Sequence, residues 1–226
     1  MFRQNDRGKH VREGFRGQLD AIRGALADMT DTAATAMERA TVALLGADLD
    51  VADGVSALAS QLDGARRAVE DRTYEVLALQ QPVASDLRTM VMAIKVGGDI
   101  DRMGSLAHHV AKVAVRRHPG YAVPDQLFPL FRQMGDMAVR MARGAEAVLQ
   151  STDAADAGRL AIDDDAMDGL RRTLFRTLLD EWPYGVEAAI DVALLGRYYE
   201  RFADHAVSIA DGVVYLVTGE LPKEPI

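Results

Sequence analysis

The sequence predicts an all-α protein built as two tandem three-helix bundles related by an internal repeat. Apolar residues recur every three or four positions along six long segments, which is the period of an amphipathic helix. Short breaks rich in proline, glycine or aspartate separate these segments, as in antiparallel helical bundles. The C-terminal stretch "YYERFAD" also has a weaker copy, "DIDRMGS", in the first half of the chain. No segment has the alternation of a strand.

The first half of the chain predicts three helices. The first covers about residues 11–47, after a flexible basic tail at residues 1–12. The second follows a break at residues 48–50 and ends before Pro82, because a proline disfavours helical geometry in the residue that precedes it. The third begins near Ser85 and ends near residue 117. Ser85 or its neighbour is the candidate N-cap of this helix.

The second half repeats this order. A fourth helix is predicted over 127–149, and a fifth extends to the "EWPYG" break. The sixth has the clearest apolar period and ends at Gly219, a residue suited to a helix C-terminus. Its apolar positions are Val192, Leu195, Tyr199, Phe202, Ala206, Ile209, Val213 and Leu216. The expected units are a first bundle at 13–120 and a second at 121–226.

Composition excludes several classes of protein. A net charge of −8 argues against nucleic-acid binding, which normally needs a basic face. The absence of cysteine excludes disulfides and thiolate metal sites. No apolar run approaches the roughly 20 residues of a membrane-spanning helix, and the start is unlike a signal peptide. We therefore expect a cytoplasmic protein.

Two carboxylate pairs, each one helical turn apart, form the candidate site. Asp164 and Asp168 lie on the fifth predicted helix, and Glu200 and Asp204 on the sixth. The first half has only one member of each pair: "DGARR" aligns Asp63 with Asp168 of "DGLRR", and Asp101 aligns with Glu200. The other two positions are Ala59 and Ser105.

Adjacent carboxylates repel each other unless a cation lies between them, so this spacing favours a hard metal ion such as Mg, Ca, Mn or iron. We expect such a site to be surface-accessible, because Glu200 and Asp204 lie away from the apolar face of their helix. A solvated acidic face without metal is the alternative. A catalytic di-iron bundle is excluded, since no histidine follows an acidic residue in a Glu-x-x-His motif.

The third and sixth predicted helices both start with apolar residues on the side of the acidic positions. The sequence favours inter-bundle packing for these residues, and a groove for a partner is the alternative. They are Leu87, Val91, Ile94, Val186, Ile190 and Ala193.

The motifs "LALQQPVASDLR", "DIDRMG" and "YERFADHAVSIA", in this order, resemble the PhoU family of phosphate-uptake regulators, in particular its actinobacterial branch. The resemblance implies metal clusters bound at repeated E/D-x-x-x-D motifs, complete here only in Asp164/Asp168 and Glu200/Asp204. In the first half it leaves Asp63 and Asp101 as candidate ligands of an incomplete motif.

The resemblance further implies a homodimeric, non-catalytic repressor of the phosphate-starvation response. Such a protein links the ATP-binding subunit of a phosphate ABC transporter to a sensor histidine kinase. A metal-dependent hydrolytic or metal-binding protein acting on phosphate compounds is the alternative function.

Overall fold

A computed structural model describes residues 3–151 and 154–219, with side chains from Gly14 in the first range and from Asp156 in the second. The helices are α1 Arg3–Gly46, α2 Leu49–Gln80, α3 Ser85–Arg117, α4 Phe128–Ser151, α5 Ala154–Leu179 and α6 Gly185–Thr218. A 3-10 turn, η1 Asp125–Leu127, precedes α4. The described ranges contain no strand, which confirms the predicted fold class.

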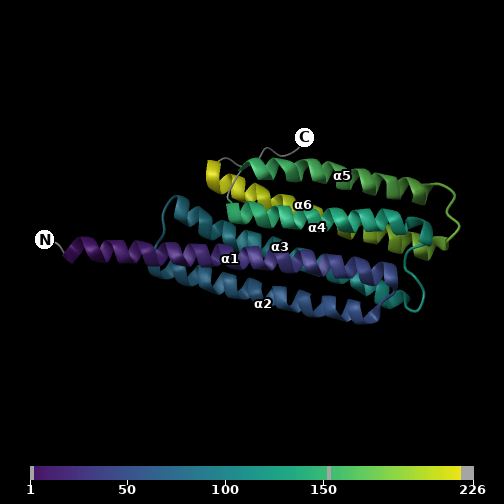
Figure 1. Cartoon of the computed structure of the whole chain (residues 1–226), viewed down its shortest axis with the longest axis horizontal. Helices are drawn as coiled ribbons and strands as arrows, with labels where there is room; N and C mark the ends of the chain where they lie inside the picture. The colour runs from purple at the N-terminus through teal and green to yellow at the C-terminus, as the bar shows by residue number, and fades with distance from the viewer. Residues whose placement is uncertain (1–2, 152–153, 220–226) are drawn as a thin grey trace.

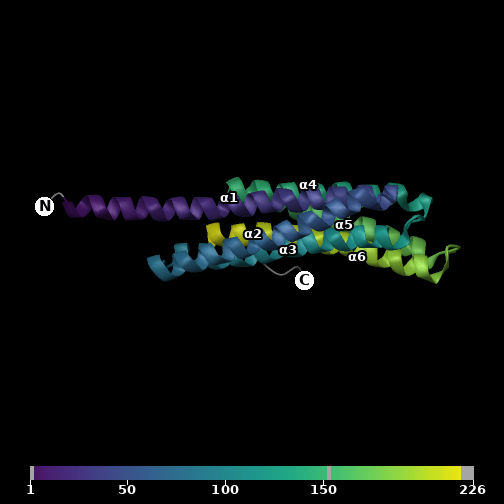
Figure 2. The same cartoon turned by 90° about the horizontal axis from the view of Figure 1, so that it is seen from below.

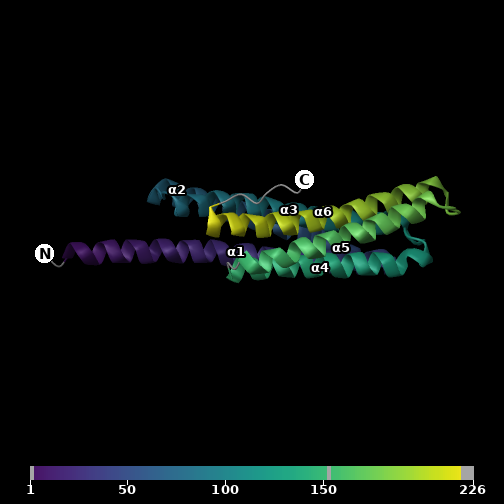
Figure 3. The ribbon, with the colours of Figure 1, turned by 90° about the horizontal axis from the view of Figure 1, so that it is seen from above.

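The six helices form two layers. Figure 1 shows α2 and α5 at the outer edges, and Figures 2 and 3 show α1 and α4 on one side of the molecule with α3 and α6 on the other. Helices α1–α3 pack together as one bundle and α4–α6 as a second. The bundles join where α1 packs against α4 and α3 packs against α6. None of the described helices has an apolar stretch long enough to cross a membrane.

Local chemistry explains several helix ends. The side chain of Asp48 caps α2 by accepting a hydrogen bond from the Val51 amide at 3.1 Å. Gln81 ends α2 in the left-handed conformation, with φ of 46°, which is a common geometry at helix C-termini. Gly219 ends α6 with φ of 76°, which confirms the predicted C-terminus.

Two predicted details at helix starts differ from the structure. Helix α1 already begins at Arg3, within the segment predicted as a flexible basic tail, because residues 3–46 contain no proline and many good helix formers. Ser85 is the first residue of α3 and not its cap. The preceding Ala84 has φ of 52° and no side-chain hydrogen bond to the helix.

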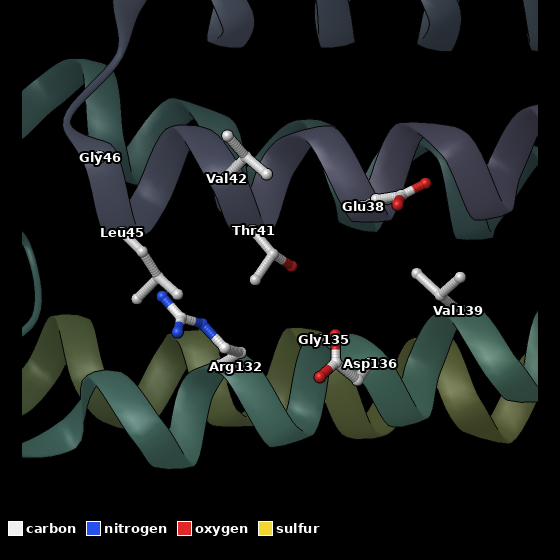
Figure 4. Close-up of a pocket in the computed structure, with 9 residues that line it drawn as sticks. All are labelled: Glu38, Thr41, Val42, Leu45, Gly46, Arg132, Gly135, Asp136 and Val139. Atoms are coloured by element: carbon white, nitrogen blue, oxygen red, sulfur yellow. The ribbon is translucent and has the colours of Figure 1, made fainter.

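The apolar core continues across both bundles. Tyr199 and Phe131 are fully buried and their rings lie 5.9 Å apart. The Tyr199 hydroxyl lies 2.9 Å from Thr41 Oγ1 of α1. Figure 4 shows Thr41 directed toward Gly135 of α4, where a Cβ atom would lie only 2.6 Å from Thr41 Oγ1. The close approach of α1 and α4 therefore depends on a residue without a side chain.

Ion pairs also join the bundles. Asp191 near the start of α6 is buried, and it accepts hydrogen bonds from both Arg116 and Arg117 at the end of α3. Arg117 also pairs with the exposed Glu187 at 2.7 Å. A buried carboxylate needs such partners, so these residues fix the end of α3 against the start of α6.

The predicted inter-bundle role of the apolar helix starts is wrong for most of the residues concerned. Val91, Val186 and Ile190 are 56%, 76% and 54% exposed. They lie near the α2–α3 and α5–α6 connections, whereas the contact between bundles is made by the core faces of α1, α3, α4 and α6. The alternative, a surface for a partner, is the one compatible with this exposure.

Candidate metal centre

The four predicted ligands of the second bundle lie on adjacent helices. Asp164 and Asp168 are on α5, Glu200 and Asp204 are on α6, and α5 packs against α6. Arg171 of α5 connects the two pairs: its guanidinium lies 3.2 Å from Glu200 Oε1 and 3.9 Å from Asp168 Oδ1. The structure thus brings the two motifs together, with an arginine between them.

Glu200 is less accessible than the sequence predicted. Its side chain is only 10% exposed, and Arg197 pairs with its second oxygen while Arg171 holds the first. The prediction of a surface-accessible strip is wrong here, because α6 packs against three other helices instead of burying one face only. Both oxygens of Glu200 are engaged by arginines.

Asp164 and Asp204 have a different environment. Neither has a cationic side chain within ion-pair distance among the described residues. Burial, followed by the negative charges of Asp204 and Asp168, raises the pKa of Asp164 to about 6. Burial also raises the pKa of Asp204, against the opposing effect of Arg197 and Arg201. Negative charge therefore gathers around Asp164, and neither Asp164 nor Asp204 forms an ion pair within 4.0 Å among the described residues.

The first bundle has the same arginine bridge between its second and third helices but lacks counterparts of Asp164 and Asp204. Arg66 of α2 lies 3.2 Å from Asp63 and 3.7 Å from Asp101 of α3. Hydrogen bonds from Arg66 lower the pKa of Asp63, and Arg67 contacts its other oxygen at 2.5 Å. Burial raises the pKa of Asp101. Here both carboxylates face arginine.

Arg66 and Arg171 are the site residues that sequence reasoning missed. They occupy the same place in "DGARR" and "DGLRR", and each bridges a carboxylate of its own helix to one on the following helix. The arginine repeated in the two motifs was the signal in the sequence that could have identified them. Its contact with the following helix can be seen only in the tertiary structure. The carboxylates shared by both repeats are thus the ones bound by arginine, and those found only in the second bundle are not.

The donor chemistry of Asp164, Asp168 and Asp204 fits a hard cation, because oxygen ligands with unbalanced negative charge attract one. Glu200 would first have to leave Arg171 or Arg197. In the described residues no three acidic or histidine side chains are already arranged as a metal-ligand set. The metal site therefore stays a prediction, with Asp164 and Asp204 as its distinctive members.

The nearby histidines have other partners. His205 Nδ1 lies 3.0 Å from Asp99 Oδ1, which links α6 to α3. His109 stacks on the Tyr198 ring, with 5.3 Å between ring centres. His108 Nδ1 lies 3.1 Å from the Ser56 hydroxyl, and burial lowers its pKa. They act here as helix-to-helix contacts.

Two tandem three-helix bundles define the class to which this fold and site belong, and in each an arginine joins a carboxylate of the second helix to one of the third. The profile of the PhoU domain matches residues 26–114 and 131–213, one match in each bundle. The chain therefore belongs to the PhoU family.

Several relatives agree with this assignment. The phosphate-specific transport system accessory protein PhoU homolog 2 of Mycobacterium tuberculosis is 46% identical over 94% of this chain and 100% of its own. Homolog 1 of Mycobacterium leprae is also 46% identical, over 95% of this chain and 97% of its own. The crystal structure of PhoU from Pseudomonas aeruginosa, 28% identical, superposes with a TM-score of 0.85 over 91% of this chain and 100% of that one.

Proposed function

We propose that this protein regulates phosphate uptake as a cytoplasmic, non-catalytic adaptor. It links the ATP-binding subunit of a phosphate ABC transporter to a sensor histidine kinase and represses the starvation response when phosphate is plentiful. The observation that carries this proposal is the similarity to a phosphate-specific transport system accessory protein over the whole length of that relative, through both bundles. We expect the adaptor to be a homodimer.

Exposed apolar residues at two helix connections support an adaptor role. Leu87 and Val91 near the α2–α3 connection are 43% and 56% exposed, and the repeat aligns them with Val186 and Ile190 near the α5–α6 connection. Figure 1 places these connections at opposite ends of the molecule. Exposed apolar clusters of this kind are typical of protein docking surfaces. Two separate ends would allow two partners to bind together.

A pull-down from phosphate-replete cells tests this role. The wild-type protein should retain both the transporter ATP-binding subunit and a histidine kinase. Val186→Ser with Ile190→Ser should lose one of them, because polar side chains remove the apolar contact. Val115→Ser, at an exposed apolar position elsewhere on α3, is the matched control and should retain both. Absence of both partners from the wild-type sample would refute the adaptor role.

The proposal also includes a divalent or iron-type metal at Asp164, Asp168 and Asp204, with Glu200 joining when an arginine moves away. Elemental analysis of purified protein should find metal that Asp204→Ala and Glu200→Ala reduce and Asp101→Ala leaves unchanged. Equal losses from Glu200→Ala and Asp101→Ala would contradict a site confined to the second bundle.

A phosphatase assay with Mn²⁺ or Mg²⁺ should give no turnover, and turnover abolished by Asp204→Ala would instead establish the hydrolytic alternative.

A further inference from the structure

A groove of about 640 Å³ opens where the bundles meet, between α2 and α3 of the first and α6 of the second. Its charged lining is unusual for a chain with a net charge of −8. Four arginines and only two carboxylates line it: Arg66, Arg102, Arg197, Arg201, Glu70 and Asp101. The groove therefore has an excess of positive charge.

Both carboxylates of the groove are paired with the same arginine. Arg66 Nη1 lies 2.6 Å from Glu70 Oε1, and Arg66 Nε lies 3.7 Å from Asp101 Oδ2. Arg197 is likewise paired, with Glu200. Arg66 and Arg197 are therefore occupied by carboxylates, and two of the four guanidinium groups of the groove remain outside any ion pair among the described residues.

Those two groups are Arg102 of α3 and Arg201 of α6. Both are exposed, and neither forms an ion pair within 4.0 Å in the part of the chain that the structure describes. They occupy the same position of the repeat, in "DIDRMGS" and "YYERFAD". Since α3 packs against α6, each bundle contributes the same residue to one groove.

Neutral hydrogen-bond donors complete the lining. Ser105 and Tyr198 each bring a hydroxyl group to the groove, and the stacking of His109 on Tyr198 fixes the tyrosine against α3. A guanidinium group is a planar fork of donors that suits the oxygens of phosphate, and hydrogen bonds to a charged acceptor are among the strongest in proteins.

We propose that this groove binds a phosphate group through Arg102 and Arg201. Its volume is in the range of small-molecule sites, so the phosphate is either free inorganic phosphate or part of a small phosphate ester. The site is distinct from the carboxylates on α5 and requires no metal.

Isothermal titration calorimetry of the full chain in metal-free buffer tests this site, with inorganic phosphate in one arm and ADP in the other. Binding of phosphate alone identifies the free ion, binding of ADP alone identifies an ester, and binding of both identifies the shared group. Arg102→Gln and Arg201→Gln should each weaken the affinity roughly tenfold or more, because each removes a charge-assisted contact.

Arg132→Gln is the matched control, because Arg132 is also exposed and lines the groove between α1 and α4 instead. It should leave the affinity unchanged, and all three variants should keep the wild-type melting temperature. No binding in either arm overturns the site, as does equal weakening by Arg132→Gln or unchanged binding in the Arg102→Gln/Arg201→Gln double variant. The partner pull-down is independent of this result, so either can fail without the other.

Discussion

Asp164 and Asp204 are the residues that distinguish the second bundle from the first, where Ala59 and Ser105 take their places. The other carboxylates of the motif are stabilised by arginines in both bundles. Burial raises the pKa of both Asp164 and Asp204, and neighbouring carboxylates add to it: Asp204 and Asp168 act on Asp164, and Asp168 acts on Asp204. Natural proteins commonly retain such destabilising charges where a ligand offsets them, which is why we place the cation here.

The pH dependence of stability reports on Asp164. Its pKa is about 6 in the folded chain against an ordinary value of 3.8, so the folded state binds this proton more tightly than the unfolded state. In metal-free buffer the free energy of unfolding should therefore rise as pH falls from about 7 to about 4. Asp164→Asn should weaken this dependence and stabilise the protein at pH 7 by about 1–2 kcal/mol, measured by urea unfolding.

Asp53→Asn, at an exposed carboxylate of α2, is the control and should change the free energy of unfolding by less than about 0.5 kcal/mol. A pH dependence that Asp164→Asn leaves intact would show that Asp164 is not strained by its neighbours.

At the scale of the helices, the junction between α3 and α6 combines a buried and an exposed ion pair on the same arginine. The Asp191 side chain is 3% exposed and binds both Arg116 and Arg117, whereas the Glu187 side chain is 80% exposed. The buried pair should matter far more, because removing one partner leaves charges without compensation in a dry site.

Asp191→Ala should destabilise the protein by about 2–4 kcal/mol, and Glu187→Ala by less than about 1 kcal/mol. Thermal unfolding of the two variants beside the wild type measures the difference. Equal effects of the two substitutions would mean that Asp191 does not fix the contact between the bundles.

Helix periodicity was sufficient to predict the six helices and their division into two bundles, because a buried apolar face repeats along each of them. The carboxylate pairs were likewise visible as neighbours on one helix. The bridges made by Arg66 and Arg171 were not, since they join residues on different helices. The burial of Glu200 and the exposure of Val186 depend on how many other helices pack against α6 at each position. The apolar period of a single helix does not contain that information.

At the scale of the whole molecule, the repeat gives one continuous core with unequal surfaces. The second bundle has the unpaired carboxylates, the junction has the basic groove, and the two ends have exposed apolar residues. An adaptor needs such separate surfaces on a rigid frame, so that one partner can bind while another site senses a ligand.

The most direct test of the proposed regulatory role is the activity of a phosphate-starvation promoter in phosphate-rich medium, compared between cells with and without this protein. We predict that the promoter is active in cells lacking the protein and is repressed again when the wild-type chain is supplied. A promoter that stays equally silent in both strains would contradict a role in repressing the starvation response.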